Sequence, residues 1–234
     1  MSKIPNYKIV IIGESNSYYI TIFYLIGMVG KTSISTRFIK EKFIKIDLSN
    51  RTINTNVFQK SLDIKGKLFN LTIWDTAGEE KYHALAPMFY RGAQGAVIIF
   101  DVTNRETFKR AIRWFSELHE FAEKDTKAIL VGNKIDLPNR VISSEEAIEL
   151  ARKYNCNFLE VSALLGTNVN EIFNSLTNTI YHQQKANHKK DKMEFNEENV
   201  DTNYGNSRSK KLKIEYNSQN QSVATKRRDK NSCC

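Results

Sequence analysis

Short apolar runs alternate with amphipathic stretches over the first 184 residues of the chain. Residues 7–12 form a compact apolar run that stops at Gly13, as expected for a buried parallel strand that ends at a functional loop. Later apolar runs have the length and composition of strands, and segments with helical periodicity separate most of them. The strand-like runs are 66–75, 95–101, 127–132 and 157–161, and the helical segments are 106–123, 143–154 and 169–181.

This alternation predicts an α/β fold, in which helices cover both faces of a mostly parallel sheet. Residues 57–64 and 68–74 flank Gly66 and have the pattern of a hairpin, which adds one antiparallel edge strand to a six-stranded sheet. Past Gln184 the apolar periodicity is lost, and Asn, Ser, Lys and Gln dominate. The sequence therefore predicts one domain over residues 1–184 and a disordered tail over residues 185–234.

The composition is that of an ordinary soluble globular protein. Hydrophobic residues make up 41% of the 234 positions and charged residues 26%. The formal net charge is +9, but many basic residues lie in the tail rather than in one patch, which argues against a nucleic-acid partner. A flexible basic tail fits the anionic cytoplasmic leaflet of a membrane, at roughly 1 kcal/mol per basic residue near the surface. A solvated tail that binds nothing is the alternative.

The chain has only three cysteines, which limits the disulfides and metal sites that it can form. Cys156 is alone in the predicted domain, and Cys233 and Cys234 are the last two residues, so the sequence offers neither a disulfide framework nor a metal cluster. The first residues lead into a strand and show no signal-peptide pattern. These features predict a cytosolic chain.

A phosphate-binding motif follows the first predicted strand, but it is interrupted. Residues 30–33, Gly-Lys-Thr-Ser, match the second half of G-x-x-x-x-G-K-[ST], whereas the glycine that ends the strand is Gly13. Removing residues 16–27 joins residues 13–15 to residues 28–33 and restores the motif at a strand-to-helix junction. Twelve residues therefore interrupt the loop, and their apolar, β-prone composition suits neither an exposed loop nor a nest of backbone N–H groups around phosphates.

Three explanations of residues 16–27 are open. We favour an unspliced in-frame intron, because AT-rich non-coding DNA translates into such runs of Tyr, Ile, Phe and Asn. If Ser15 is AGT, Ile26 is ATA and Gly27 begins with G, an intron from GT to AG fits, and splicing regenerates serine. The second explanation is a genuine insertion that loops out and leaves the phosphate site intact or damaged. The third is a transmembrane segment, although the apolar stretch falls short of the ~20 residues that a spanning helix needs.

Two further motifs follow at the ends of later strands. Residues 74–78, Trp-Asp-Thr-Ala-Gly, offer in Asp75 a carboxylate suited to a metal shell and in Gly78 an N–H that can face a terminal phosphate. Residues 133–136, Asn-Lys-Ile-Asp, offer in Asp136 a carboxylate that can accept hydrogen bonds from the N1 and N2 donors of guanine, an arrangement that adenine lacks. Together with the phosphate loop, these motifs predict a guanine-nucleotide site.

These motifs, with residues 89–93 and the terminal cysteine pair, make residues 6–184 resemble a Rab small GTPase of the Ras superfamily. Residues 82–94 and the rejoined phosphate loop look most like the early-endosomal Rab subgroup. The resemblance implies a P-loop NTPase fold and a GTP/GDP switch that hydrolyses GTP with Mg²⁺ and recruits effectors in vesicle-mediated, endosomal transport. It also implies a guanine nucleotide exchange factor, a GTPase-activating protein, a GDP-dissociation inhibitor and a prenylation escort as partners. If the insertion truly disrupts the phosphate loop, the chain is instead a nucleotide-impaired Rab-like interaction protein.

The resemblance also assigns roles to individual residues. Lys31 would reach the β- and γ-phosphates, Thr32 and Thr52 would ligate Mg²⁺, and Asp75 would hold one of its waters. Ser162-Ala163 resembles the loop whose backbone N–H groups complete the guanine pocket, although Leu164 follows it where the family usually has lysine. The predicted nucleotide-binding set is Gly13, Glu14, Ser15, Val29, Gly30, Lys31, Thr32, Ser33, Thr52, Asp75, Gly78, Asn133, Lys134, Asp136, Ser162 and Ala163.

One substitution changes the expected chemistry. Glu79 stands where the family has the glutamine that orients the attacking water. An ionised carboxylate cannot donate a hydrogen bond and repels the charge that builds on the phosphoryl oxygens, so we predict slow hydrolysis and a population biased toward the GTP-bound form. An activating protein that compensates is the alternative. The predicted catalytic set is Lys31, Thr52, Gly78 and Glu79.

Two surface regions take their roles from the same resemblance. Phe58, Trp74 and Phe89 would form the aromatic surface that Rab effectors contact, and a core role for Trp74 and Phe89 is the alternative. Cys233 and Cys234 resemble the substrate for double geranylgeranylation, and two lipids matter because one alone anchors only marginally. We therefore expect the chain on the cytoplasmic face of endomembranes, at the early endosome, and cycling through the cytosol.

Overall fold

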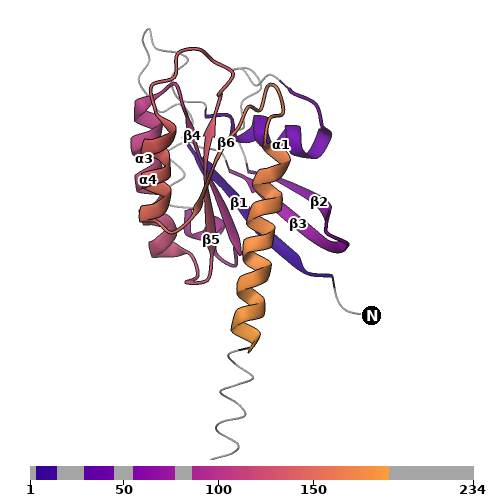
Figure 1. Cartoon of the computed structure of the whole chain (residues 1–234). Coiled ribbons are helices and arrows are strands. Elements are labelled where there is room, and N and C mark those ends of the chain that lie inside the picture. The colour runs from indigo at the N-terminus through magenta and orange to yellow at the C-terminus, as the bar shows by residue number, and fades with distance from the viewer. Residues whose placement is uncertain (1–3, 15–28, 45–54, 77–85, 190–234) are drawn as a thin grey trace, which may run out of the picture. The chain divides into compact units, whose positions relative to one another are not determined.

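The computed structural model describes residues 4–14, 29–44, 55–76 and 86–189 (Figure 1). Most residues of the predicted phosphate-binding motif, without the insertion, fall within these ranges, and so do both predicted base-binding loops. The predictions for Ser15, for residues 16–27, for Thr52, for Gly78 and Glu79, and for Cys233 and Cys234 lie outside the described residues.

A six-stranded sheet forms the centre of the domain, with the strand order β2-β3-β1-β4-β5-β6. Its neighbouring strands are parallel except β2 and β3, which form an antiparallel hairpin closed by Lys65 and Gly66, both at positive φ. This confirms the mostly parallel sheet with one antiparallel edge strand. The strands are β1 (Asn6–Gly13), β2 (Asn56–Ile64), β3 (Lys67–Asp75), β4 (Gly95–Asp101), β5 (Lys127–Asn133) and β6 (Asn157–Glu160).

The register of the parallel strands brings their carboxyl ends to one edge of the sheet. Gly13 at the end of β1 lies opposite Ile99 of β4, and Asp101 at the end of β4 lies opposite Asn133 at the end of β5. Asp75 at the end of β3 lies opposite Ile11 of β1. Polar residues that are far apart in the sequence therefore meet at this edge, which is where ligands bind in open α/β sheets.

Helices cover both faces of the sheet, as predicted (Figure 1). On one face, α1 (Lys31–Lys40) and the helix at 169–189 pack together, and the rings of Phe38 and Phe173 stack with centroids 3.8 Å apart. On the other face, α3 (Arg105–Phe121) and α4 (Ser144–Lys153) enclose a second apolar cluster, and the short α2 (Ala86–Tyr90) adds Tyr90 to it. The last helix continues to residue 189, past the end expected at 181, so residues 185–189 are helical rather than part of a disordered tail.

Side-chain caps define where α3 and α4 begin. The side chain of Asn104 accepts hydrogen bonds from the N–H groups of Glu106 and Thr107, and the side chain of Ser143 accepts one from the N–H of Glu146. Such caps satisfy N–H groups that have no partner inside the helix. Both caps are residue types that are common at helix starts, and each helix begins one residue away from its predicted start.

The hairpin of β2 and β3 corrects the prediction for Phe58. Phe58 lies opposite Ile73 and packs against the apolar cluster on the α1 face, so it does not join an outward aromatic surface. Val57 lies opposite Trp74 on the other face and is 49% exposed. Neighbouring residues of a strand point to opposite faces, so the side chain opposite Trp74 is that of Val57, one position before Phe58.

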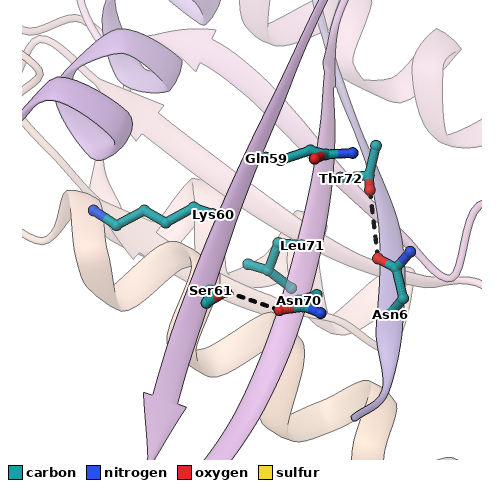
Figure 2. Close-up of a pocket in the computed structure, with 7 residues that line it drawn as sticks. All are labelled: Asn6, Gln59, Lys60, Ser61, Asn70, Leu71 and Thr72. Atoms are coloured by element: carbon teal, nitrogen blue, oxygen red, sulfur yellow. Dashed lines mark hydrogen bonds between the residues drawn. The ribbon is translucent and has the colours of Figure 1, made fainter. Parts of the chain in front are cut away.

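A polar pocket of about 320 Å³ crosses the outer face of β2, β3 and β1 (Figure 2). Its amides and hydroxyls hydrogen-bond to one another: Ser61 Oγ donates to Asn70 Oδ1 over 2.8 Å, and Thr72 Oγ1 donates to Asn6 Oδ1 over 3.4 Å. Asn6 begins β1, whereas the candidate site lies where β1 ends. We assign no ligand to this pocket, because four of its polar side chains, those of Asn6, Ser61, Asn70 and Thr72, already hydrogen-bond in pairs.

Candidate functional site

The two halves of the interrupted phosphate motif lie side by side. The backbone N–H of Val29 donates to the carbonyl oxygen of Glu14 over 3.4 Å, so the chain re-enters the domain where it left it. In a chain without residues 16–27, Glu14 and Val29 would be the first and fourth residues of a turn, and this hydrogen bond is the one that closes a β-turn. The backbone on either side of the insertion therefore already has the pairing of an uninterrupted loop.

Two glycines allow the loop to fit against its neighbours. A Cβ at Gly13 would lie 2.7 Å from the carbonyl oxygen of Ile99 and 2.8 Å from Cγ2 of Val29. Gly30 has a φ of 90°, and a Cβ there would lie 2.5 Å from Nδ2 of Asn133. Gly30 also precedes α1, where free backbone N–H groups and the helix dipole favour an anion.

Lys31 is the buried cation of the site. Its ammonium donates to the carbonyl oxygens of Gly13, at 2.9 Å, and Glu14, at 3.3 Å, and the residue is 6% exposed. Burial lowers the pKa of Lys31 to about 8, and the carboxylates of Asp75 and Glu14 oppose that shift. The positive charge therefore lies inside the phosphate loop, from where it can reach a bound phosphate.

Asp75 supplies a buried carboxylate at the same edge of the sheet. Among the described residues, no group makes a well-formed hydrogen bond to either of its oxygens. Burial raises the pKa of Asp75, and the side chains of Thr32, Asn56 and Ser35 together with the charge of Lys31 offset only part of that effect. A buried carboxylate without a well-formed hydrogen-bond partner among the described residues, beside a threonine hydroxyl, is a hard-oxygen donor set, so these residues fit Mg²⁺ or its bound water.

Asn133 ties the phosphate loop to the loop after β6. Its Nδ2 donates to the carbonyl oxygen of Val29 over 2.8 Å, and its Oδ1 accepts from the N–H of Ala163 over 3.1 Å. The residue is buried, so both hydrogen bonds are shielded from water. Asn133 therefore positions two loops of the predicted site relative to each other.

The residues after Asn133 pair with the loop at 162–167. Ser162 Oγ donates to Asp136 Oδ1 over 2.5 Å and accepts from the N–H of Leu165 over 3.0 Å. Lys134 has a φ of 69°, and its ammonium lies 2.6 Å from Oδ2 of Asp101. These contacts hold the Asp136 carboxylate next to Ser162 and Ala163, as expected of a guanine pocket.

Two arginines that belong to no motif hold these loops. Arg37 of α1 donates from Nη2 to the carbonyl oxygen of Leu165 over 3.0 Å and lies so close to Gly166 that a Cβ there would be 2.6 Å from it. Arg110 of α3 forms an ion pair with Glu14, with Nη1 2.5 Å from Oε1. Only the folded contacts identify these residues, because both lie far in sequence from the groups they hold.

The described part of the predicted set comes together at the carboxyl edge of the sheet, on β1, β3, β5, the start of α1 and the loop after β6. Gly13, Glu14, Val29, Lys31, Asn133 and Ala163 are connected by the contacts above. Thr32 adjoins Asp75, and Asp136 adjoins Ser162. Ser33 lies in the first turn of α1 without a contact that assigns it a role.

The sequence model of the Ras family matches residues 22–182. The match begins inside the insertion and omits β1 with Gly13, as expected when extra residues separate the two halves of one motif.

Rab proteins of plants and an amoeba are similar to the chain over most of their length. Ras-related protein RABA2b of Arabidopsis thaliana is 37% identical over 177 residues, which cover 75% of this chain and 76% of that protein. Ras-related protein Rab-11C of Dictyostelium discoideum is 40% identical, covering 75% and 73%. Ras-related protein Rab5A of Oryza sativa subsp. japonica is 36% identical over 186 residues, covering 79% and 85%. The similarity extends over several Rab subgroups and does not single out the early-endosomal one.

Proposed function

Because the chain belongs to the Ras family and, within it, to the Rab small GTPases, we propose that it binds GTP and GDP around Lys31 and acts as a switch in vesicle trafficking. Members of this family are P-loop NTPases that bind guanine nucleotides and hydrolyse GTP. The observation that carries the proposal for this chain is the hydrogen bond from Val29 to Glu14. It supports a closed phosphate loop in spite of the insertion, which family membership alone leaves undecided.

The described residues offer a contact for each part of a guanine nucleotide. The N–H groups at the start of α1 and the ammonium of Lys31 would bind the phosphates. Thr32 and Asp75 would hold Mg²⁺ and one of its waters, and the bound ion would neutralise charge on the phosphate oxygens. Asp136, held by Ser162, would accept the N1 and N2 hydrogens of guanine.

The switch would work through the segments around Thr52 and Gly78. The γ-phosphate orders such segments, effectors bind the ordered form, and hydrolysis releases it. The proposed effector surface is Trp74 and Phe89, whose ring centroids are 6.5 Å apart, with Val57 rather than Phe58 beside Trp74. The cycle would use an exchange factor, an activating protein and a GDP-dissociation inhibitor.

Hydrolysis by this chain is proposed to be slow, because Glu79 replaces the glutamine that orients water. A carboxylate at that position offers no hydrogen to the γ-phosphate and adds a like charge near it. Slow turnover lengthens the time that the chain spends in the GTP-bound form. Effector binding would then depend more on an activating protein than on intrinsic hydrolysis.

The chain is proposed to act on the cytoplasmic face of endomembranes, at the early endosome, held by geranylgeranyl groups on Cys233 and Cys234 after delivery by a prenylation escort. The proposed tether is the tail after the last helix, residues 190–234, whose basic residues would add attraction to anionic lipids. Among the helices of the described residues, none has the length and apolar character needed to cross a bilayer.

A titration of the purified full-length chain with fluorescent GDP and Mg²⁺ tests the proposed function. We expect saturable binding that GDP and GTP compete for, that ATP does not, and that EDTA weakens. The variant Lys31→Met serves as the control and should bind far more weakly, because it loses the buried cation. Binding only after deletion of residues 16–27 would identify the insertion as the obstacle, and binding by neither chain would favour the nucleotide-impaired interaction protein.

A further inference from the structure

Resting on the proposed nucleotide site, we propose that Arg110 is a positioning residue, whose ion pair with Glu14 holds the first half of the phosphate loop in place across the insertion. Nη1 of Arg110 lies 2.5 Å from Oε1 of Glu14. Neither residue belongs to the predicted catalytic set. Arg110 acts on the nucleotide only through Glu14.

Burial makes this ion pair consequential. The side chain of Glu14 is 6% exposed and that of Arg110 is 36% exposed, so the carboxylate depends on protein groups rather than on water for its partners. Lys31 contributes a second positive charge, since the Glu14 carboxylate acts on the Lys31 ammonium. The Glu14 carboxylate is therefore paired with a cation of α3 and also interacts with the cation of the loop.

Arg110 is presented by a firmly held helix. Its neighbours Phe108, Ala111 and Trp114 are buried in the apolar cluster of the α3 face. At the start of α3, the hydroxyl of Thr107 accepts from the N–H of Asp101 over 3.0 Å, which ties the helix to the end of β4. A guanidinium on such a helix provides a fixed anchor for the carboxylate of Glu14.

Glu14 passes this restraint to the rest of the loop through its carbonyl oxygen. That oxygen accepts from the N–H of Val29 over 3.4 Å and from the ammonium of Lys31 over 3.3 Å. A displacement of Glu14 would therefore move both the closing hydrogen bond and the buried cation. The position of the Glu14 side chain would therefore influence how Lys31 and the loop backbone contact a bound phosphate.

The insertion should make the chain depend on this anchor. In a chain without residues 16–27, only two residues separate Glu14 from Val29, and the short covalent link keeps them together. In the full chain, the longer connection raises the entropic cost of bringing the two halves together, so non-covalent contacts have to supply more of the restraint. Loss of Arg110 and deletion of the insertion should therefore have non-additive effects.

The test measures GDP dissociation, in the presence of Mg²⁺ and excess unlabelled GDP, for the full chain and for the chain lacking residues 16–27, each with and without Arg110→Met. We expect the substitution to speed GDP release about tenfold in the full chain and about threefold or less in the shortened chain. Arg110→Lys should restore much of the slow release, because it keeps the charge. The matched control is Arg113→Met, which removes an exposed arginine from the same helix and should leave the rate unchanged.

Hydrogen exchange in the EDTA-treated, nucleotide-free chain provides a second readout that does not depend on the proposed function. Arg110→Met should speed exchange of the amides at 29–34 and leave those of α4 unchanged. In the single variant, the unpaired charge of Glu14 could unfold the chain. The double variant Glu14→Gln, Arg110→Met removes that charge. Faster exchange throughout the chain, or equal effects of Arg110→Met with and without the insertion, would overturn the assignment. A chain that binds no nucleotide contradicts the proposed function, whereas exchange at 29–34 still decides the role of Arg110.

Discussion

Val29 donates a backbone hydrogen bond of 3.4 Å to Glu14, and this contact joins the two ends of the interruption in the phosphate loop. The same pairing would close a β-turn if the twelve extra residues were absent. Glu14 and Val29 are therefore already paired as they would be in the short chain. A genuine insertion and an unspliced intron are both compatible with this geometry, and the transcript distinguishes between them.

Deleting residues 16–27 is expected to raise the free energy of unfolding of the nucleotide-free chain by about 1–2 kcal/mol, because a shorter loop costs less entropy to close. Urea unfolding of the two chains measures the difference, and the m-value should change little. A shortened chain that unfolds more readily would mean that residues 16–27 contribute contacts that outweigh their entropic cost.

Asp136→Asn is expected to lower GTP affinity by about 10- to 100-fold, because a charged acceptor of two hydrogen bonds is lost. The amide of the variant can donate as well as accept, so it should improve binding of XTP, which has a carbonyl in place of the guanine N2 amine. Competition between GTP and XTP measures the change, with Asp125→Asn as an exposed, remote control. An unaltered preference for GTP would remove Asp136 from the base pocket.

The stability of the nucleotide-free chain should rise with pH above about 8 because of Lys31. Burial lowers the pKa of Lys31 in the folded chain to about 8, from an ordinary value of 10.5. Between these values the unfolded chain holds a proton that the folded chain has released, so higher pH favours folding, by at most about 1.4 kcal/mol per pH unit. Urea unfolding from pH 7.5 to 10 measures this contribution, which Lys31→Met should lack. Identical pH slopes for the two proteins would refute it.

Glu79→Gln is expected to speed intrinsic GTP hydrolysis by about 10²-fold, which is the scale of one well-placed hydrogen-bond donor to the transition state. Single-turnover phosphate release from the chain lacking residues 16–27 isolates this effect from the insertion. Glu80→Gln is the matched control, because it removes the same charge from the adjacent position. If both substitutions left the rate where it was, Glu79 would not account for slow turnover.

The strand-end motifs could be predicted from the sequence because short local patterns carry them. Each of three motifs follows an apolar run that has the pattern of a strand. They are Gly13, the Asp-containing motif at 74–78 and the Asn-Lys-Ile-Asp motif at 133–136. Motifs at the ends of parallel strands have to share one edge of the sheet. The described parts of the site, from Gly13 to Ala163, lie at that edge. Local chemistry and the rule for parallel strands were sufficient there.

Contacts between distant segments could not be predicted in the same way. Arg37 and Arg110 lie on helices whose pattern shows only which face is apolar, and nothing in the sequence tells which loop each guanidinium meets. The side of the sheet on which Phe58 lies could not be predicted from its aromatic character, because a strand reverses its faces at each residue and the side depends on the exact pairing of β2 with β3. Val57 rather than Phe58 therefore lies opposite Trp74.

The nucleotide content of the full-length chain, purified under native conditions without added nucleotide, tests the central claim most directly. Protein denatured after gel filtration releases its ligand, and ion-exchange chromatography identifies and quantifies it. The account predicts nearly stoichiometric GDP or GTP in the full chain and very little in the Lys31→Met variant. A full chain that carries no guanine nucleotide and takes up none when GDP and Mg²⁺ are supplied would contradict a phosphate loop closed between Glu14 and Val29.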